Sequence, residues 1–138
     1  MRQILYCSNS TIPGNEADLD GILSQSRNNN AIDGVTGLLW SNGAHFLQVF
    51  EGPDESVSLT WDRICSDTRH CDITVLRDKP IQTREFGHWT MAFRRNDGEA
   101  DIFDNQVRRL VSHASISIRN PFLEMIAMDR CRLDKGSA

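Results

Sequence analysis

The chain has 138 residues, of which 39% are hydrophobic and 25% are charged, and its formal net charge is −4. This composition is typical of one globular domain rather than of a disordered or fibrous chain. The acidic balance argues against direct binding to nucleic acid, which needs a basic surface. No apolar run reaches the ~18–20 residues of a membrane span, and the N-terminus lacks a signal-peptide pattern, so we expect a cytoplasmic protein without a membrane contact.

The N-terminal third of the sequence predicts a strand followed by a helix. Residues 2–8 form a short β-prone run, which Pro13-Gly14 terminates. From residue 16 to about residue 29, apolar side chains recur at helical spacing, and Asn15 can cap the start.

A hairpin and a second helix are predicted next. Asn42-Gly43 separates two apolar runs, residues 36–41 and 44–51, and this dipeptide is a strong signal for a tight turn between antiparallel strands. Pro53 and two acidic residues then favour a helix that runs to about Ser66.

Two further strands are predicted over residues 72–77 and 86–93, which completes the order βαββαββ. This order is that of ferredoxin-like α+β domains, in which both helices cover one face of a mixed sheet. The fold hosts many functions and therefore decides none of them.

The C-terminal part predicts two appended helices. The first carries apolar residues at helical spacing from Phe103 to Val111, and the second begins with Asn120 as cap and Pro121 as first helical residue. We therefore divide the chain into a domain of residues 1–97, a helical extension of residues 98–133 and a tail of residues 134–138.

The four cysteines give no sign of a metal site. Cys7, Cys65, Cys71 and Cys131 form no CxxC pair and accompany no histidine pair at ligand spacing. We expect buried free thiols that act as small hydrophobic residues in a reducing compartment.

Several neutral polar side chains stand out because we expect them to face one space. Ser26, Asn29 and Asn30 lie at the end of the first predicted helix, and Gln48 interrupts an otherwise apolar strand. A buried amide without a partner costs roughly 1–3 kcal/mol, so Gln48 should be hydrogen-bonded. The asparagines alone are better explained as solvated amides at a helix C-terminus.

Tyr6 is the single tyrosine, and it lies on a predicted strand of the same sheet. By itself it could be a core tyrosine with a satisfied hydroxyl. A phenol and an amide on one sheet, facing helices with Asn and Ser, instead suit a flat ligand with an apolar body and a polar edge. An isoalloxazine ring is such a ligand.

From Arg2 to about Arg94 the sequence resembles the BLUF family, blue-light sensors that use FAD. The resemblance depends on linked motifs that occur in the family's order and spacing: Tyr6-Cys7-Ser8, residues 26–31, residues 34–39, residues 46–52, Arg69-His70 and residues 89–91. It implies a non-enzymatic sensor that binds FAD non-covalently, with FMN or riboflavin as alternatives.

The resemblance also implies roles for particular residues. Tyr6 would donate an electron and then a proton after blue light is absorbed, and Gln48, which bridges Tyr6 to the flavin, would be left rearranged. Trp89 and Met91 on the last strand would take part in signalling. The remaining flavin-binding residues would be Ile22 and Ile64 as clamps, Asn30, Asn29 and Ser26 at the polar edge, and Arg63 near the ring or phosphate tail.

Because the chain shows no catalytic output domain, we expect a separate output protein or a second copy of the chain to read the signal through the C-terminal helices. An open apolar sheet face would favour a homo-oligomer. Two alternatives remain at this point. An acylphosphatase-type enzyme would need an arginine in a phosphate-binding loop after the first strand, but residues 8–14 contain none. A light-insensitive binding module would be colourless and would not take up flavin.

Overall fold

The computed structural model describes residues 1–10, 34–41, 45–68, 70–87, 89–93 and 100–136. In this part of the chain, five strands form one sheet in the order β4-β1-β3-β2-β5. Neighbouring strands are antiparallel except β2 and β5, which are parallel. The strands are β1 (Arg2–Ser10), β2 (Thr36–Ser41), β3 (His45–Gly52), β4 (His70–Pro80) and β5 (Trp89–Phe93).

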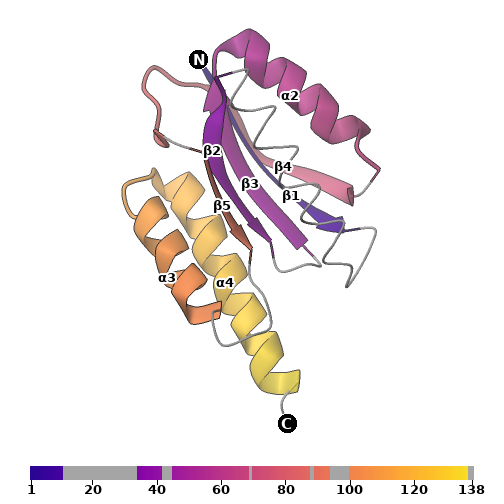
Figure 1. The fold of residues 1–138 in the computed structure, drawn as a ribbon, viewed down its shortest axis with the longest axis vertical. Coiled ribbons are helices and arrows are strands. Elements are labelled where there is room, and N and C mark those ends of the chain that lie inside the picture. The colour runs from indigo at the N-terminus through magenta and orange to yellow at the C-terminus, as the bar shows by residue number, and fades with distance from the viewer. Residues whose placement is uncertain (11–33, 42–44, 69, 88, 94–99, 137–138) are drawn as a thin grey trace.

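The described helices lie on both sides of this sheet, as Figure 1 shows. Helix α2 (Asp54–Ser66) follows Pro53 and carries two acidic residues in its first turn, as predicted. Helices α3 (Ala100–Val111) and α4 (Ile116–Gly136) pack against the opposite face. The α+β ferredoxin-like fold with two appended helices is therefore confirmed, while the helix predicted over residues 16–29 lies outside the described residues.

Strand alternation divides the buried side chains into two clusters. One cluster, on the α2 side, contains Ile4, Tyr6, Val35, Phe50 and Val57. The other cluster lies between the sheet and the C-terminal helices and consists of Leu5, Leu38, Trp40, Leu47, Val49, Phe86, Val107, Val111, Ala114, Ile118, Phe122 and Ile126. The chain's own helices therefore cover the sheet face that we expected to be open, which removes the reason given for a homo-oligomer.

The start of the last helix was predicted wrongly. Helix α4 begins at Ile116, so Pro121 lies inside it rather than at its first position. The carbonyl of Ser115 accepts the backbone N–H groups of Ile118 and Arg119 at 3.0 and 2.9 Å, which closes the first turn. Ile118 is fully buried, so tertiary packing and this turn outweigh the Asn-Pro signal.

The predicted limits of two strands were also wrong. Strand β5 begins at Trp89, because the N–H of Phe86 donates to the Glu51 carboxylate at 2.6 Å rather than to a neighbouring strand. Strand β4 extends to Pro80, which is tolerated because β4 lies at the edge of the sheet. Among the described residues, no helix is long and apolar enough to cross a bilayer.

Candidate functional site

The centre of the candidate site is a buried pair of polar side chains on the α2 side of the sheet. Tyr6 on β1 and Gln48 on β3 are directly opposite each other in the antiparallel register. The Tyr6 hydroxyl donates to Oε1 of Gln48. The exposed fractions of the two residues are 3% and 4%. The expected burial and hydrogen bonding of Gln48 are confirmed.

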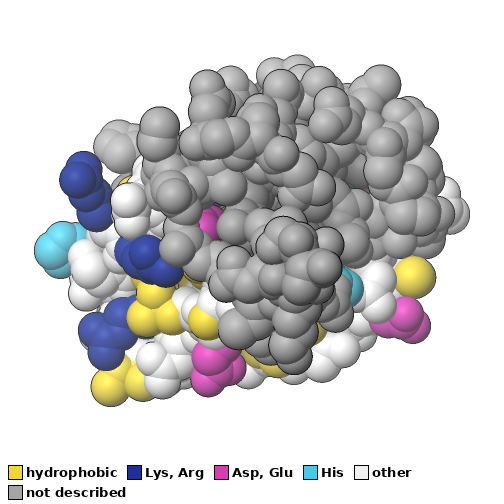
Figure 2. Space-filling view, turned by 90° about the horizontal axis from the view of Figure 1, so that it is seen from below, with side chains coloured by type: hydrophobic (Ala, Val, Ile, Leu, Met, Phe, Trp, Pro, Cys, Tyr) yellow, Lys and Arg dark blue, Asp and Glu magenta, His cyan; other side chains and the backbone are white. Residues whose placement is uncertain are grey.

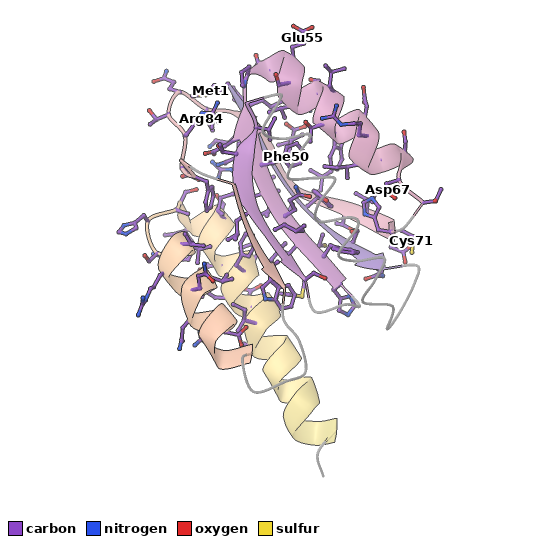
Figure 3. The ribbon with its side chains drawn as sticks, viewed as in Figure 1. Met1, Phe50, Glu55, Asp67, Cys71 and Arg84 are labelled. Atoms are coloured by element: carbon purple, nitrogen blue, oxygen red, sulfur yellow. The ribbon has the colours of Figure 1, made fainter. Side chains whose placement is uncertain are left out.

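The phenol of Tyr6 is held in its neutral form. Burial raises the pKa of Tyr6 well above its ordinary range, and the negative charge of Asp67 raises it further. Asp67 lies directly after the end of α2, on the side of the sheet that carries this pair (Figure 3). A neutral phenol retains its proton and can act as a hydrogen-bond donor.

Aromatic side chains surround the phenol ring. Trp61 on α2 lies edge-on to Tyr6 with ring centroids 5.3 Å apart, and Phe50, labelled in Figure 3, lies edge-on at 6.3 Å. Phe50 and Trp61 also stack on each other at 6.2 Å. These rings give the Tyr6–Gln48 pair a surrounding of low polarity, in which its hydrogen bonds are strengthened.

His70 connects the end of α2 to the strand that carries Tyr6. Its Nε2 lies 2.6 Å from the carbonyl of Ile64, and its Nδ1 lies 2.8 Å from Oγ of Ser8. Because a carbonyl only accepts, Nε2 carries a proton, and in the neutral ring Nδ1 accepts from the Ser8 hydroxyl. The His70 ring lies 6.2 Å from the Tyr6 ring, so this bridge fixes one side of the site.

His70 and Trp61 border the site, although the sequence alone indicated no role for either residue. His70 was visible only as part of the Arg69-His70 motif, and Trp61 only as an apolar position of the second helix. The signal that could have found them is the spacing of aromatic rings along a helix and a strand that border the same sheet face. That signal is weak, because the same spacing also describes an ordinary core.

Of the other predicted site residues, only Ile64 and Arg63 have described side chains, and only Ile64 packs near Tyr6. Ile64 is half-buried and packs against the cluster that contains Tyr6. Arg63 is exposed and donates to Oγ1 of Thr60 on its own helix at 3.2 Å. The remaining four, Ile22, Ser26, Asn29 and Asn30, lie outside the described residues.

Trp89 and Met91 are described through their backbone in β5. The register pairs Gln48 with Leu39 and Leu39 with Met91, so Tyr6, Gln48, Leu39 and Met91 form one row across four strands. Trp89 pairs with Gly37, two positions along. Strand β5 is therefore in direct register with the Tyr6–Gln48 pair.

The described residues fit a flavin in their donor set. A neutral, buried hydrogen-bonding pair and the aliphatic side chain of Ile64 suit an uncharged ring system with a polar edge. No group of three or more metal-ligating side chains occurs among the described residues. Cys7, Cys65 and Cys71 are free thiols, as expected, but Cys65 and Cys71 are exposed, so the expectation of buried thiols is wrong for these two.

Comparisons with known proteins agree with this geometry. The chain is 34% identical over 89 residues to photoactivated adenylate cyclase subunit beta of Euglena gracilis, which covers 64% of this chain and 10% of that protein. It is 38% identical over 69 residues to the blue light- and temperature-regulated antirepressor BluF of Escherichia coli (strain K12), which covers 50% of this chain and 17% of that protein. The matches therefore span only a small part of these relatives.

Among solved structures, the dark state of the BLUF protein BlrB has a TM-score of 0.68 at 27% identity, covering 92% of this chain and 96% of that chain. A bacterial light-regulated adenylyl cyclase has a TM-score of 0.66 at 25% identity, covering 98% and 36%. The family model for BLUF, described as sensors of blue-light using FAD, matches residues 1–92. The chain thus belongs to the BLUF family of flavin-binding blue-light sensors.

Proposed function

We propose that the chain is a non-enzymatic blue-light photoreceptor in which Tyr6 and Gln48 form the switch and FAD is the flavin. The observation that carries this proposal is the buried hydrogen bond between these two side chains. The family assignment supports a sensor and removes the acylphosphatase-type alternative. FMN and riboflavin remain alternatives to FAD, and the expected cytoplasmic location stays a prediction.

When bound, the flavin supplies the absorption of blue light and the capacity to accept an electron. With a flavin bound, Tyr6 would transfer an electron and then its Oη proton to the ring, and it would recover both in the return step. Gln48 is left with its amide rearranged. This is feasible because a tyrosine hydroxyl both donates and accepts, so Tyr6 can bond either end of the Gln48 amide.

The remaining pocket assignments are part of the same proposal. Ile22 and Ile64 clamp the ring, Ser26, Asn29 and Asn30 hold its polar edge, and Arg63 approaches the ring or the phosphate tail. The exposed position of Arg63 favours the phosphate tail, because a solvated guanidinium suits a charged phosphate better than an uncharged ring. Trp89 and Met91 report the change of Gln48 through β5.

The energy available from this switch is small. Changing two hydrogen bonds shifts free energy by about 0.5–1.5 kcal/mol each, whereas moving an equilibrium from 1:99 to 99:1 needs about 5.5 kcal/mol. The output element must therefore be nearly balanced in the dark. We propose that helices α3 and α4 are this element and that a separate protein reads them.

Partnering through a second copy of the chain has less support than the sequence suggested. The apolar face of the sheet is covered by α3 and α4. Where the described residues are visible in Figure 2, hydrophobic side chains lie among charged and polar ones.

Light-minus-dark absorption spectra of Tyr6→Phe and Gln48→Leu test the switch. Both proteins should be yellow, because the apolar surroundings of the flavin survive, and neither should show the persistent red shift of the unmodified protein. Cys7→Ala is the matched control, because Cys7 is adjacent to Tyr6 but packs on the other sheet face. A normal red shift in either switch variant, or its loss in the control, would contradict the proposal.

A further inference from the structure

On the sheet face opposite Tyr6, a second glutamine joins two carboxylates. Gln3 on β1 and Glu51 on β3 are cross-strand partners, and both are fully buried. The amide Nε2 of Gln3 donates to Oε2 of Glu51 and to Oε2 of Glu85, each at 2.9 Å. Arg77 donates from Nε to Oε1 of Gln3 at 2.9 Å. Because a guanidinium only donates and a carboxylate only accepts, the Gln3 amide has one allowed orientation.

The Glu85 carboxylate extends this connection to the last helix. Its Oε1 accepts the backbone N–H of Ser115 at 3.1 Å, and its Oε2 accepts the Ser115 hydroxyl at 3.3 Å. The Ser115 carbonyl in turn closes the first turn of α4. The hydrogen bonds therefore run without interruption from β3 through Gln3 and Glu85 to the start of α4.

The loop between β4 and β5 is held by the same network. Glu51 accepts the N–H of Phe86 through its Oε1. Next to it, Arg84, labelled in Figure 3, donates to Oγ1 of Thr36 at 2.7 Å and to the carbonyl of Gly34 at 2.9 Å. The loop thus presents Glu85 to Ser115 from a fixed position.

Glu51 also lies close to the switch in the chain. It is three residues after Gln48 on β3, and the two side chains point to opposite faces of the sheet. Glu51 is therefore the member of this network that a movement of β3 at Gln48 would reach through the backbone of the strand. A buried polar network is costly when it is only partly satisfied, so it changes between discrete arrangements rather than stretching gradually.

One buried polar group near this network lacks a hydrogen-bond partner among the described residues. Within the described part of the chain, the indole Nε1 of Trp40 is buried on this face without a hydrogen-bond partner. A buried donor without a partner costs roughly 1–3 kcal/mol. The interface between the sheet and the C-terminal helices thus combines a buried apolar cluster with polar contacts at its edge and one unpaired donor in its interior.

We propose that Gln3, Glu51 and Glu85 form a coupling network that transmits the state of Gln48 to the first turn of α4. This inference depends on the proposed function, because it names the route by which the C-terminal helices receive the light signal. The three side chains are positioning residues, because they are bonded to one another through Gln3 and to Ser115 through Glu85, on the sheet face opposite Tyr6.

Hydrogen exchange in the light and in the dark tests the route. In the unmodified protein, the amides around the start of α4 should change their exchange rate on illumination. Glu85→Ala should keep the flavin and the red shift but lose this light-dependent change. Glu124→Ala is the matched control, because it removes an exposed carboxylate from α4 itself and should retain the light-dependent change in exchange.

A second variant covers the case in which Glu85→Ala does not fold. Gln3→Met keeps the length of the side chain but cannot bridge the two carboxylates. It should also keep the red shift and lose the light-dependent change in exchange at the start of α4. An α4 response of normal size in either variant, or its loss in Glu124→Ala, overturns the network while leaving the photoreceptor proposal intact. Absence of a red shift in the unmodified protein overturns both.

Discussion

Helix α4 offers a test of how firmly the C-terminal helices belong to the sensor core. Ile118 is 0% exposed and packs against the sheet, whereas Ile116, two residues earlier in the same helix, is 63% exposed. Removing a buried isoleucine side chain down to alanine costs about 2–5 kcal/mol, because apolar contact is lost and a cavity remains. For a chain of this size we expect Ile118→Ala to lower Tm by roughly 5–20 °C.

Urea denaturation followed by circular dichroism and by flavin absorption measures this effect. Ile116→Ala deletes the same atoms in the same helix and should stay within about 0.5 kcal/mol of the unmodified protein. Equal stabilities of the two variants would refute the packing of α4 on the sheet. A single transition in both signals is expected because strand and helix residues share one cluster. Two transitions would instead support the predicted division at residue 97.

Three further perturbations follow from particular contacts. Gly37→Ala should destabilise the protein by about 1–3 kcal/mol or more, because its Cβ would overlap with the backbone of β3, whereas Gly87→Ala meets nothing within 4 Å and serves as control in the same thermal melt. Asp78→Asn should lower the free energy of unfolding by about 0.2–1 kcal/mol at neutral pH, because hydrogen bonds from Arg2 stabilise the Asp78 carboxylate and lower its pKa. The contribution of the carboxylate is present above its ordinary pKa of 3.8 and is lost as pH falls through the lowered value, so the urea midpoints of the two proteins should converge in acid. In the folded state Tyr6 should give no tyrosinate absorption near pH 10, measured as the difference between the unmodified protein and Tyr6→Phe. The free energy of unfolding should decline above that pH, because Tyr6 ionises first in the unfolded chain; ionisation near its ordinary pKa in the folded protein would contradict its burial.

Much of the fold was predictable because it depends on local patterns. Alternation of apolar and polar residues correctly placed Gln48 on the face opposite Leu47 and Val49. The Asn42-Gly43 signal correctly predicted that the strands on either side pair, and Ser41 is opposite Phe46. These features need only neighbours in the chain, which a single sequence displays directly.

The errors occurred where distant groups decide the boundary. The end of the loop before β5 is determined by the Glu51 carboxylate, which takes the N–H of Phe86. The start of α4 is determined by Glu85 on Ser115 and by the burial of Ile118. Neither contact has a signature near the boundary, so local propensity and proline position gave the wrong residue.

The two buried glutamines show which property of the site could not be inferred from residue type. Gln3 has a donor on one side and two acceptors on the other, so rotating its amide would place like groups together. Gln48 is bonded to the Tyr6 hydroxyl, which satisfies either end of an amide. The amide of Gln3 is therefore fixed on one face of the sheet, whereas the amide of Gln48 on the other face can rotate. In the proposed route, this difference would allow a rearrangement of Gln48 to be transmitted through Gln3, because a Gln3 amide that rotated as freely as Gln48 would give no defined change at Glu85.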